Sequence, residues 1–465
     1  MSESRRRGDL FVARTRIAAP AERVFAWHAR PGALARLIPP WERVDVLSTE
    51  GGIAAGARVV VRLHVGPFAI RWTARHTHYV EGVEFVDEQE SGPFSSWRHT
   101  HRVEPDGPSA CVLEDRVEFR LPGGPIGNAL GRPFVRAKLR RMFKHRHEVT
   151  AADVREHEKV ADRAKLTVAV TGASGLVGGM LVPFLTTGGH TVHRLVRRKS
   201  PWGDVKDEIY WRPDTGEIDG ARLEGVDAVV NLAGENIGEK RWSEERKALF
   251  RQSRVDGTKL LATTLAGLAK KPKVLINASA VGYYGDRGEE ELDETSAPGN
   301  DFLAQMCRDW EAATKPAEDA GIRVVHLRIG LVLAARGALA RMALPFKLGV
   351  GGPIGTGKQY MPWIAVDDVV GVIHSAMFDD ELRGAVNTVA PEAVTNAEFS
   401  RTLGRVLKRP SFVPVPAFAL RAAVGAELAE VVLGGQRVKP KRLEERAYEW
   451  RFPKLEDALR HVLGR

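Results

Sequence analysis

Two cysteines, Cys111 and Cys307, are all that this chain of 465 residues contains. A pair so far apart in sequence excludes a disulfide framework and a cysteine-based zinc site, and it suggests a reducing compartment. The first ten residues are polar and rich in arginine with no apolar segment after them, so we expect no secretory signal. A run of about 18 apolar residues, the length that indicates a membrane span, is also missing. We therefore predict a cytoplasmic protein without a membrane span.

A nucleic-acid partner is not expected either. The formal net charge is +10, but the excess of lysine and arginine is scattered, apart from one concentration at 132–165 on an expected helix. The chain carries no RNA- or DNA-binding motif. We interpret the charge as a solvated helix face together with attraction for a phosphate-bearing cofactor. No metal site is predicted.

The first 155 residues contain several stretches that alternate apolar and polar side chains. This alternation is typical of antiparallel strands with one face in water. A first strand at 10–17 and a short helix from Pro20 precede these stretches, and a long helical stretch at about 133–156 follows them. The alternating stretches are 58–65, 70–77, 83–89, 97–103 and 111–119.

This order of elements resembles the START-like helix-grip fold of the polyketide cyclase and lipid-transport superfamily, over residues 8–152. The opening pattern Ala-Ala-Pro-Ala-Glu-Arg-Val-Phe at 18–25 adds to the resemblance. The resemblance implies a curved α+β sheet that wraps the long helix and leaves an apolar cavity, so an apolar ligand is a candidate partner of residues 1–155. Four aromatic residues either line such a cavity or form plain core: Trp72, Phe85, Phe94 and Trp97.

Residues 156–165 are charged and lack apolar periodicity, which indicates a linker. From residue 166 onward, strands alternate with helices, and this alternation is typical of an α/β, doubly wound parallel sheet of Rossmann type. We assign this domain to 166–385 and a C-terminal lobe to 386–465. The expected strands are 166–170, 192–196, 228–232, 273–277 and 323–328, and the expected helices are 176–185, 242–268 and 302–319.

A glycine-rich turn, Thr-Gly-Ala-Ser-Gly-Leu-Val-Gly at 171–178, joins the first of these strands to its helix. Glycines in this position let the backbone approach a pyrophosphate, and the helix end adds free N–H groups and a partial positive charge. We therefore predict a dinucleotide site. The predicted cofactor-binding residues of the turn are Gly172, Ala173, Ser174, Gly175, Leu176, Val177 and Gly178.

The next strand ends in Arg197 and Arg198, followed by Lys199 and no carboxylate. In dinucleotide-binding folds an acid at this position binds the ribose 2′-hydroxyl of NAD, whereas a base accepts the 2′-phosphate of NADP. We therefore predict NADP, with NAD as the less favoured cofactor. The third strand ends in small residues that leave room for the cofactor over the sheet edge: Leu232, Ala233 and Gly234.

Together with Asn-Leu-Ala-Gly at 231–234, the turn resembles the extended short-chain dehydrogenase/reductases of the NAD-dependent epimerase/dehydratase group. Further segments narrow the resemblance to an atypical branch, the epimerase family proteins, over residues 165–465. Fusion to a START-like domain also occurs in this branch. The segments that carry the narrower resemblance are 231–237, 241–242, 253–255, 279–285, 351–357, 362–368 and 434–440.

The family resemblance implies cofactor contacts at the turn, at both arginines and at the small residues after the third strand. It adds Arg254, on the helix after that strand, and Val332, close to where the nicotinamide would lie. For Arg254 a buried structural ion pair is an equally open interpretation.

A catalytic pair typical of active short-chain dehydrogenases is absent. These enzymes use a tyrosine to move a proton and a lysine four residues later to lower the tyrosine pKa, both on one helix face. In the expected helix, Phe302 or Leu303 falls near the tyrosine position and Met306 or Cys307 near the lysine position. None of these side chains can do acid–base work, so the sequence leaves activity open.

Two other residues are candidates for catalysis. Ser279, at the end of its expected strand, could hold a substrate carbonyl oxygen, and Tyr283 in the following loop could be a substitute proton donor or part of the pocket lining. Three functions follow as hypotheses: an NADP-dependent oxidoreductase or epimerase on a small carbonyl or sugar-like substrate, a non-catalytic NADP-binding sensor or scaffold, and a hydrophobic-ligand carrier that uses the N-terminal cavity.

Overall fold

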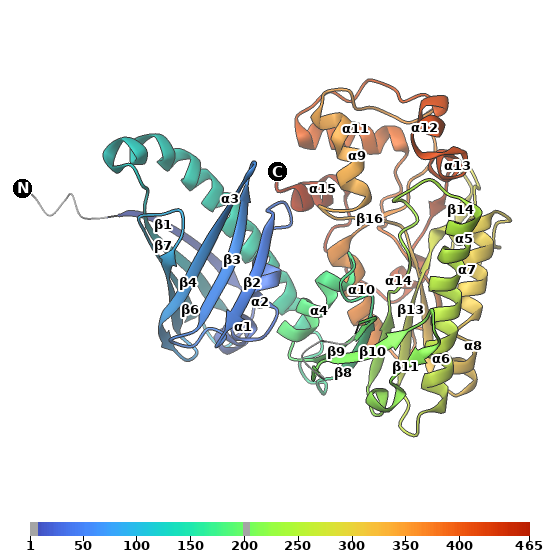
Figure 1. The fold of residues 1–465 in the computed structure, drawn as a ribbon, viewed down its shortest axis with the longest axis horizontal. Helices are drawn as coiled ribbons and strands as arrows, with labels where there is room; N and C mark the ends of the chain where they lie inside the picture. Colours follow the sequence, from blue (N-terminus) through green and yellow to red (C-terminus); the bar gives the residue numbers. More distant parts are fainter. Residues whose placement is uncertain (1–7, 199–204) are drawn as a thin grey trace, which may run out of the picture. The chain divides into compact units, whose positions relative to one another are not determined.

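The computed structural model describes residues 8–198 and 205–465 and divides the chain into two compact units, essentially Met1–Ala164 and Lys165–Leu463. Figure 1 shows the first unit in blue and the second from green to red. In the described part of the chain, no helix is long and apolar enough to cross a membrane.

The first unit is a seven-stranded antiparallel sheet in the order β1-β7-β6-β5-β4-β3-β2. The long helix α3 (Gly124–Glu158) lies across one face of this sheet (Figure 1), and it packs there through Leu139, Phe143 and Val149. The alternating stretches predict the antiparallel strands, and the helix-grip architecture that the family resemblance implies is confirmed. The other elements are β1 Asp9–Ile17, α1 Ala21–Ala29, α2 Ala33–Leu37, β2 Val44–Glu50, β3 Arg58–Val65, β4 Phe68–Val80, β5 Glu84–Ser91, β6 Ser96–Pro105 and β7 Cys111–Arg120.

Two features of this unit differ from the sequence predictions. The edge strand β2 was not predicted, because its residues are almost all exposed and carry no buried alternation. Helix α3 begins at Gly124 and contains Pro133 in its interior, whereas we expected it to begin near that proline. Its first turns expose Ile126, Leu130 and Phe134, so the buried stripe that reveals a helix in a sequence is missing there.

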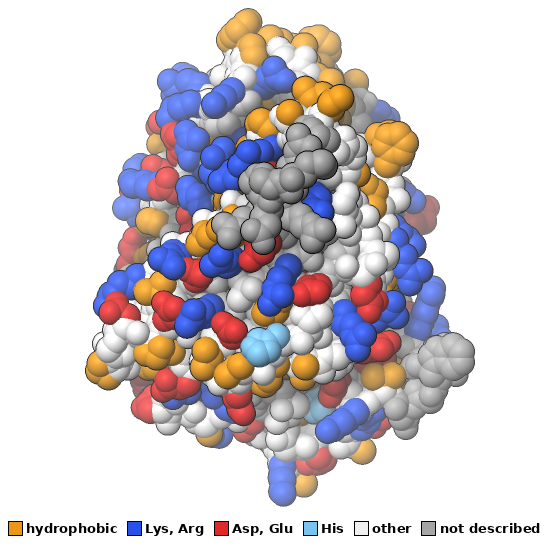
Figure 2. Space-filling view, turned by 90° about the vertical axis from the view of Figure 1, so that its left-hand side faces the viewer, with side chains coloured by type: hydrophobic (Ala, Val, Ile, Leu, Met, Phe, Trp, Pro, Cys, Tyr) orange, Lys and Arg blue, Asp and Glu red, His pale blue; other side chains and the backbone are white. Residues whose placement is uncertain are grey.

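Charged side chains on the first unit are interspersed rather than segregated. Figure 2 shows Lys and Arg side chains with Asp and Glu among them over the face that it displays. On α3, Arg132 lies 2.6 Å from Asp9 and Lys138 lies 2.9 Å from Glu42. In both pairs the basic partner is exposed to solvent. The basic stretch at 132–165 is thus largely a solvated helix surface.

The second unit is built on an eight-stranded sheet in the order β11-β10-β9-β8-β12-β13-β15-β18. All of its neighbours pair in parallel except β10 and β11, so the predicted Rossmann-type sheet is confirmed. Helices α4 and α10 cover one face, and α6 and α8 cover the other (Figure 1). The strands are β8 Thr167–Thr171, β9 Thr191–Val196, β10 Glu208–Arg212, β11 Glu217–Ile218, β12 Ala228–Asn231, β13 Val274–Ala280, β15 Arg323–Ile329 and β18 Gly384–Thr388.

The helices of this unit are shorter than expected. The single helix expected at 242–268 is interrupted by a π-helical turn at Gln252–Asp256, and the one expected at 302–319 divides before Pro316. The helices around the sheet are α4 Gly178–Thr187, α5 Glu244–Arg251, α6 Gly257–Gly267, α7 Phe302–Ala312, α8 Lys315–Asp319 and α10 Val366–Phe378.

The C-terminal segment forms a helical layer with its own core, in which Trp363, Phe399 and Leu459 are buried. The predicted boundary at 385 falls inside β18, because residues 386–388 continue the sheet beside β15. The remaining elements are β14 Glu291–Leu292, β16 Leu331–Leu333, α9 Ala338–Lys347, β17 Trp363–Ala365, α11 Asn396–Leu407, α12 Ala417–Val424, α13 Ala426–Leu433, β19 Arg437–Val438, α14 Lys441–Glu445 and α15 Leu455–Leu463.

Candidate functional site

The glycine turn lies between the end of β8 and the start of α4, as predicted. A Cβ atom at Gly172, whose φ is +63°, would lie 2.7 Å from the Leu232 carbonyl oxygen, and one at Gly178 would lie 2.3 Å from the Gly172 oxygen. The fold itself therefore requires both glycines. At Gly175 an added Cβ would meet only the Gly172 oxygen, at 3.1 Å, and the residue is exposed. Gly175 is thus the position where a missing side chain leaves room for a ligand.

A buried polar network holds the strand ends that flank the turn. The Thr171 hydroxyl accepts hydrogen bonds from the backbone N–H groups of Leu232 (3.0 Å) and Ala233 (3.1 Å) and donates one to Asn231 Oδ1 (2.6 Å). Asn231 in turn donates to Asn277 Oδ1 at 2.7 Å. The carboxyl ends of β8, β12 and β13 are thereby fixed in register, and the small residues after β12 lie beside the turn.

Arg197 and Arg198 follow the last residue of β9 and are both exposed. Because β9 pairs in parallel with β8, its carboxyl end lies at the same sheet edge as the glycine turn. Asp214 is close enough to Arg197 to feel its charge. The pKa of Asp214 is lowered by a hydrogen bond from Arg212 and also by the charge of Arg197. Lys199 lies outside the described residues.

Arg254 lies in the π-helical turn and supports the loop after β12. Its Nη2 donates to the Glu235 carbonyl oxygen at 2.9 Å, and a Cβ at Gly234 would lie 3.0 Å from its guanidinium carbon. Its guanidinium lies 5.2 Å from the centre of the Trp310 ring, and burial lowers its pKa. Both hydrogen bonds of the Arg254 guanidinium go to backbone carbonyl oxygens, those of Phe250 and Glu235. The contact of Arg254 with a cofactor stays a prediction.

Val332, in β16, is half-buried and packs against the main core of the sheet. It pairs in parallel with Ile364 of β17. Its position beside the nicotinamide also stays a prediction.

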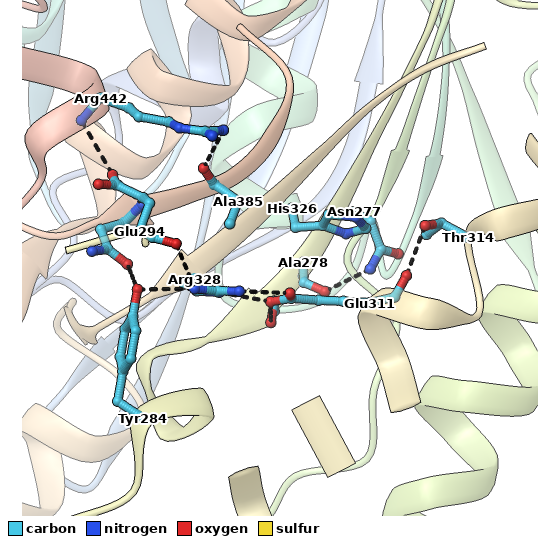
Figure 3. Close-up of polar contacts among 12 residues, drawn as sticks. Asn277, Ala278, Tyr284, Glu294, Glu311, Thr314, His326, Arg328, Ala385 and Arg442 are labelled. Carbon is cyan, nitrogen blue, oxygen red and sulfur yellow. Dashed lines mark hydrogen bonds and ion pairs between the residues drawn. The ribbon is translucent and has the colours of Figure 1, made fainter. Parts of the chain in front are cut away.

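Ser279 lies next to last in β13 and is buried. Its hydroxyl donates to Glu311 Oε1 on α7 at 2.7 Å. The same carboxylate is bound by both arms of the Arg328 guanidinium, from Nε to Oε1 and from Nη2 to Oε2, each at 2.9 Å (Figure 3). The proton of Ser279 is therefore already donated within the protein.

Two tyrosines follow Ser279 in the short 3-10 helix Val281–Tyr284. The Tyr284 hydroxyl accepts from Arg328 Nη1 at 3.0 Å and donates to Asn387 Oδ1 at 2.7 Å, and burial raises its pKa to about 12. Tyr283 is half-buried, and the Arg328 guanidinium lies 3.4 Å from the centre of its ring. Tyr284 thus has a structural role, whereas Tyr283 carries a cation against its ring face.

Neither Glu311 nor Arg328 was predicted as part of the site. A local signal for one of them exists, because Arg328 lies in a strand whose residues 324–328 are buried on both faces, where a charge needs a partner.

We expect Arg328→Leu to lower the free energy of unfolding by roughly 3 kcal/mol, because Glu311 would remain buried without its partner. Urea titration followed by circular dichroism measures the change. Arg212→Leu is the control, since it breaks an exposed pair with Asp214 (2.9 Å) and is expected to leave the free energy of unfolding nearly unchanged. Equal effects of the two substitutions would mean that the Glu311 carboxylate is solvated in solution.

The helix positions where active enzymes carry tyrosine and lysine are apolar and packed. Leu303, Met306 and Cys307 of α7 are all buried. Burial raises the pKa of Cys307 to about 12, which agrees with a thiol that takes no part in catalysis.

Both cysteines are expected to be inert toward a thiol reagent such as Ellman's reagent in the native protein. Burial also raises the pKa of Cys111 to about 11, so at pH 8 only on the order of one thiol in a thousand would be ionised. Both should react at once in guanidinium chloride, which serves as the control. Rapid labelling of one thiol in the native protein would contradict this expectation.

The aromatic residues of the first unit pack against one another. Trp72 lies 5.0 Å from Trp97, and Phe94 lies 4.8 Å from Trp97, between ring centres, so these three form core. A cavity of about 430 Å³ lies elsewhere, between β1 and α3. It is lined by Phe11, Val12, Ala13, Arg14, Thr15, Arg136, Arg140, Phe143, Lys144 and His147. Four basic side chains make this lining less apolar than the resemblance implies.

Comparison with known families agrees with this division of the chain. Residues 168–387 match the family described as "NAD dependent epimerase/dehydratase family". Residues 17–146 match "Polyketide cyclase / dehydrase and lipid transport", and residues 415–462 match a domain of unknown function.

Individual relatives cover either the second unit or nearly the whole chain. An epimerase family protein of Mycobacterium bovis is 42% identical over 305 residues, which are 65% of this chain and 99% of the relative. The crystal structure of a nucleoside-diphosphate sugar epimerase from Corynebacterium glutamicum has a TM-score of 0.80 at 34% identity and covers 98% of this chain and 90% of that one. The human epimerase family protein SDR39U1, solved with NADPH, has a TM-score of 0.60 at 36% identity, over 64% of this chain and 99% of the human one.

Proposed function

Because the chain belongs to the NAD dependent epimerase/dehydratase family, we propose that it binds NADPH and acts with it as an oxidoreductase or epimerase on a small carbonyl or sugar-like substrate. One observation carries the proposal. The exposed, open Gly175 and the exposed Arg197 and Arg198 lie at the same edge of the parallel sheet. A pyrophosphate and a 2′-phosphate need these two features at one edge. The human relative solved with NADPH supports this cofactor.

NADPH would supply the hydride, and the residues of this chain would bind and orient it. The free N–H groups at the start of α4 would hold the pyrophosphate, Arg197 and Arg198 the 2′-phosphate, and Leu232 to Gly234 the face of the cofactor over the sheet. Arg254 would keep the loop after β12 in place through its bond to the Glu235 carbonyl. Residues 386–465 would form the substrate lobe.

Ser279 and Tyr283 are the residues that we propose for the substrate side. Ser279 would hold the substrate oxygen once its hydroxyl turns away from Glu311. Tyr283 would donate the proton, with the guanidinium of Arg328 over its ring in place of the missing lysine. One observation favours the alternative of a non-catalytic NADPH sensor, namely that the Ser279 proton is already donated to Glu311.

Turnover separates these two functions. NADPH oxidation would be followed over a panel of aldehydes, ketones and nucleotide sugars. Stereochemical exchange at sugar carbons would be followed by NMR with NADP⁺ supplied, because an epimerase first passes a hydride from the sugar to NADP⁺ and then returns it, with no net change of the cofactor. We expect turnover with at least one substrate class and a loss of roughly 100-fold or more in kcat for Ser279→Ala and Tyr283→Phe. Tyr79→Phe, in the first unit, is the matched control. Tight NADPH binding without turnover on any substrate would favour the sensor.

The N-terminal unit supports a second candidate activity, transport of a hydrophobic ligand. The match to a lipid-transport family favours it, and the cavity between β1 and α3 is the candidate place for a ligand, with basic side chains that would suit an apolar compound with an acidic group. Organic extraction of the purified full-length protein, followed by mass spectrometry, tests it. A stoichiometric apolar compound would support this role, and its absence after expression in several hosts would count against it.

A further inference from the structure

Buried histidines and aspartates gather in the first unit, where a helix-grip fold usually has apolar core. Asp87 of β5, His99 and His101 of β6, Asp115 of β7 and His147 of α3 form this cluster, which we call the His–Asp cluster. The sheet register places Asp87 opposite His99 and Asp115 opposite His101. Because His99 and His101 are two residues apart on one strand, both rings lie on the same sheet face.

Asp115 fixes the orientation of three imidazole rings. Its Oδ1 lies 2.8 Å from His99 Nε2 and 2.7 Å from His101 Nδ1, and its Oδ2 lies 2.6 Å from His147 Nε2. An ionised carboxylate only accepts protons in such contacts, so His99 Nε2 and His147 Nε2, which are hydrogen-bonded to it, carry the N–H. Phe85 stacks on the ring of His101, with 4.2 Å between ring centres and 14° between planes, and holds that ring in place.

The other ring nitrogens, His99 Nδ1 and His101 Nε2, both face Asp87. His99 Nδ1 lies 3.2 Å and His101 Nε2 lies 3.4 Å from the same Asp87 oxygen, and the three atoms lie within 4.8 Å of one another. Two ring nitrogens and a carboxylate oxygen at this spacing are held together either by a proton on a ring or by a metal cation between them. Ligands at about 2.0–2.1 Å from a tetrahedral Zn²⁺ are about 3.3 Å apart, which matches these distances.

We propose that Asp87, His99 and His101 bind one divalent zinc-like ion, and that Asp115 is the outer carboxylate that orients both imidazole ligands. Two neutral imidazoles and one carboxylate are donors that suit Zn²⁺. A carboxylate on the far nitrogen of each ring is the usual support of a histidine metal ligand. Three protein ligands leave a fourth position for water or a bound molecule, and Asp87, with 15% of its side chain exposed, lies on the open side of the cluster.

The surrounding charge is compatible with a cation. The buried guanidinium of Arg146 interacts with both Asp115 and Asp87, and burial lowers its pKa. Two carboxylates against one guanidinium leave one negative charge to balance, either by a proton on His99, whose pKa, against the effect of burial, is raised to about 8 by Asp87 and Asp115, or by the ion. This site is independent of the function proposed for the second unit.

The test uses the full-length, untagged protein after treatment with a chelator. Competition against a chromophoric chelator measures zinc affinity and stoichiometry. We expect one equivalent of zinc in the wild type, a loss of affinity of roughly 100-fold or more for Asp87→Asn, and a loss of about 10–100-fold for Asp115→Asn. His64→Gln is the matched control, because His64 also lies 2.8 Å from an aspartate, Asp45, without a second histidine. We expect it to leave the affinity unchanged.

A measurement on the wild type alone covers the case in which these variants fail to fold. Co²⁺ bound at the site should show the visible bands of four-coordinate nitrogen and oxygen ligation with no thiolate charge-transfer band. Less than stoichiometric zinc in the wild type, equal affinities of the wild type and Asp87→Asn, or a spectrum of six-coordinate aqueous Co²⁺ would each overturn the proposal. The His–Asp cluster would then be a proton-bearing ion-pair network.

Discussion

Gly175→Val is expected to abolish NADPH binding, with a loss of affinity of roughly 1,000-fold or more, while the protein stays folded. The reason is that Gly172 and Gly178 are closely surrounded by backbone atoms, whereas Gly175 is not. A Cβ at Gly175 meets one carbonyl oxygen of its own turn and otherwise points into open space, so the valine side chain would occupy the volume that a pyrophosphate needs. Calorimetric titration with NADPH measures the affinity, and thermal unfolding measures the fold.

Two further substitutions complete this experiment. Gly179→Ala is the matched control, because a Cβ there has nothing within 4 Å, and it should keep wild-type affinity and stability. Gly178→Val should lower the melting temperature, because its Cβ would lie 2.3 Å from a carbonyl oxygen. If Gly175→Val binds NADPH as the wild type does, the pyrophosphate does not lie on this turn.

The fold was largely predictable because most of its strands bury one face or both. Strands β3 to β7 show alternation, and β8, β12 and β13 are short apolar runs between loops. Of the strands in the two large sheets that escaped prediction, β2, β11 and β18 lie at sheet edges, whereas β10 lies between β9 and β11. The exposed β2 has no buried face to mark it, and β11 is only two residues long. An edge strand forms because it pairs with a neighbouring strand, and the pattern of a single sequence does not show that pairing.

Predictability of the candidate site depends on how far apart its residues are in the sequence. The glycine turn is continuous, so its spacing alone indicates a phosphate site. Ser279, Glu311 and Arg328 come from three separate elements, and their contact exists only because β13 and β15 are neighbours with α7 packed beside them. The His–Asp cluster escaped for the same reason, because Asp87, Asp115 and His147 join the closely spaced pair His99 and His101 from three other elements.

Replacement of both arginines after β9, Arg197→Glu with Arg198→Glu, is expected to weaken NADPH binding roughly 100- to 10,000-fold and NADH binding far less. Charge-assisted hydrogen bonds to a phosphate contribute about 1.5–3 kcal/mol each, so two of them account for roughly 3–6 kcal/mol. At about 1.4 kcal/mol per tenfold change, this sum corresponds to the stated range. NADH lacks the 2′-phosphate and therefore loses only the general attraction of two positive charges.

Titrations of both cofactors against both proteins give the selectivity ratio that decides the assignment. Lys206→Glu is the control, because it is an equally exposed base just before the amino end of β10, away from the carboxyl edge where the turn lies. It should change neither affinity appreciably. Equal losses for NADPH and NADH in the double variant would show that the arginines act only through long-range charge. The 2′-phosphate would then be bound elsewhere, and the preference for NADP would need another origin within the second unit.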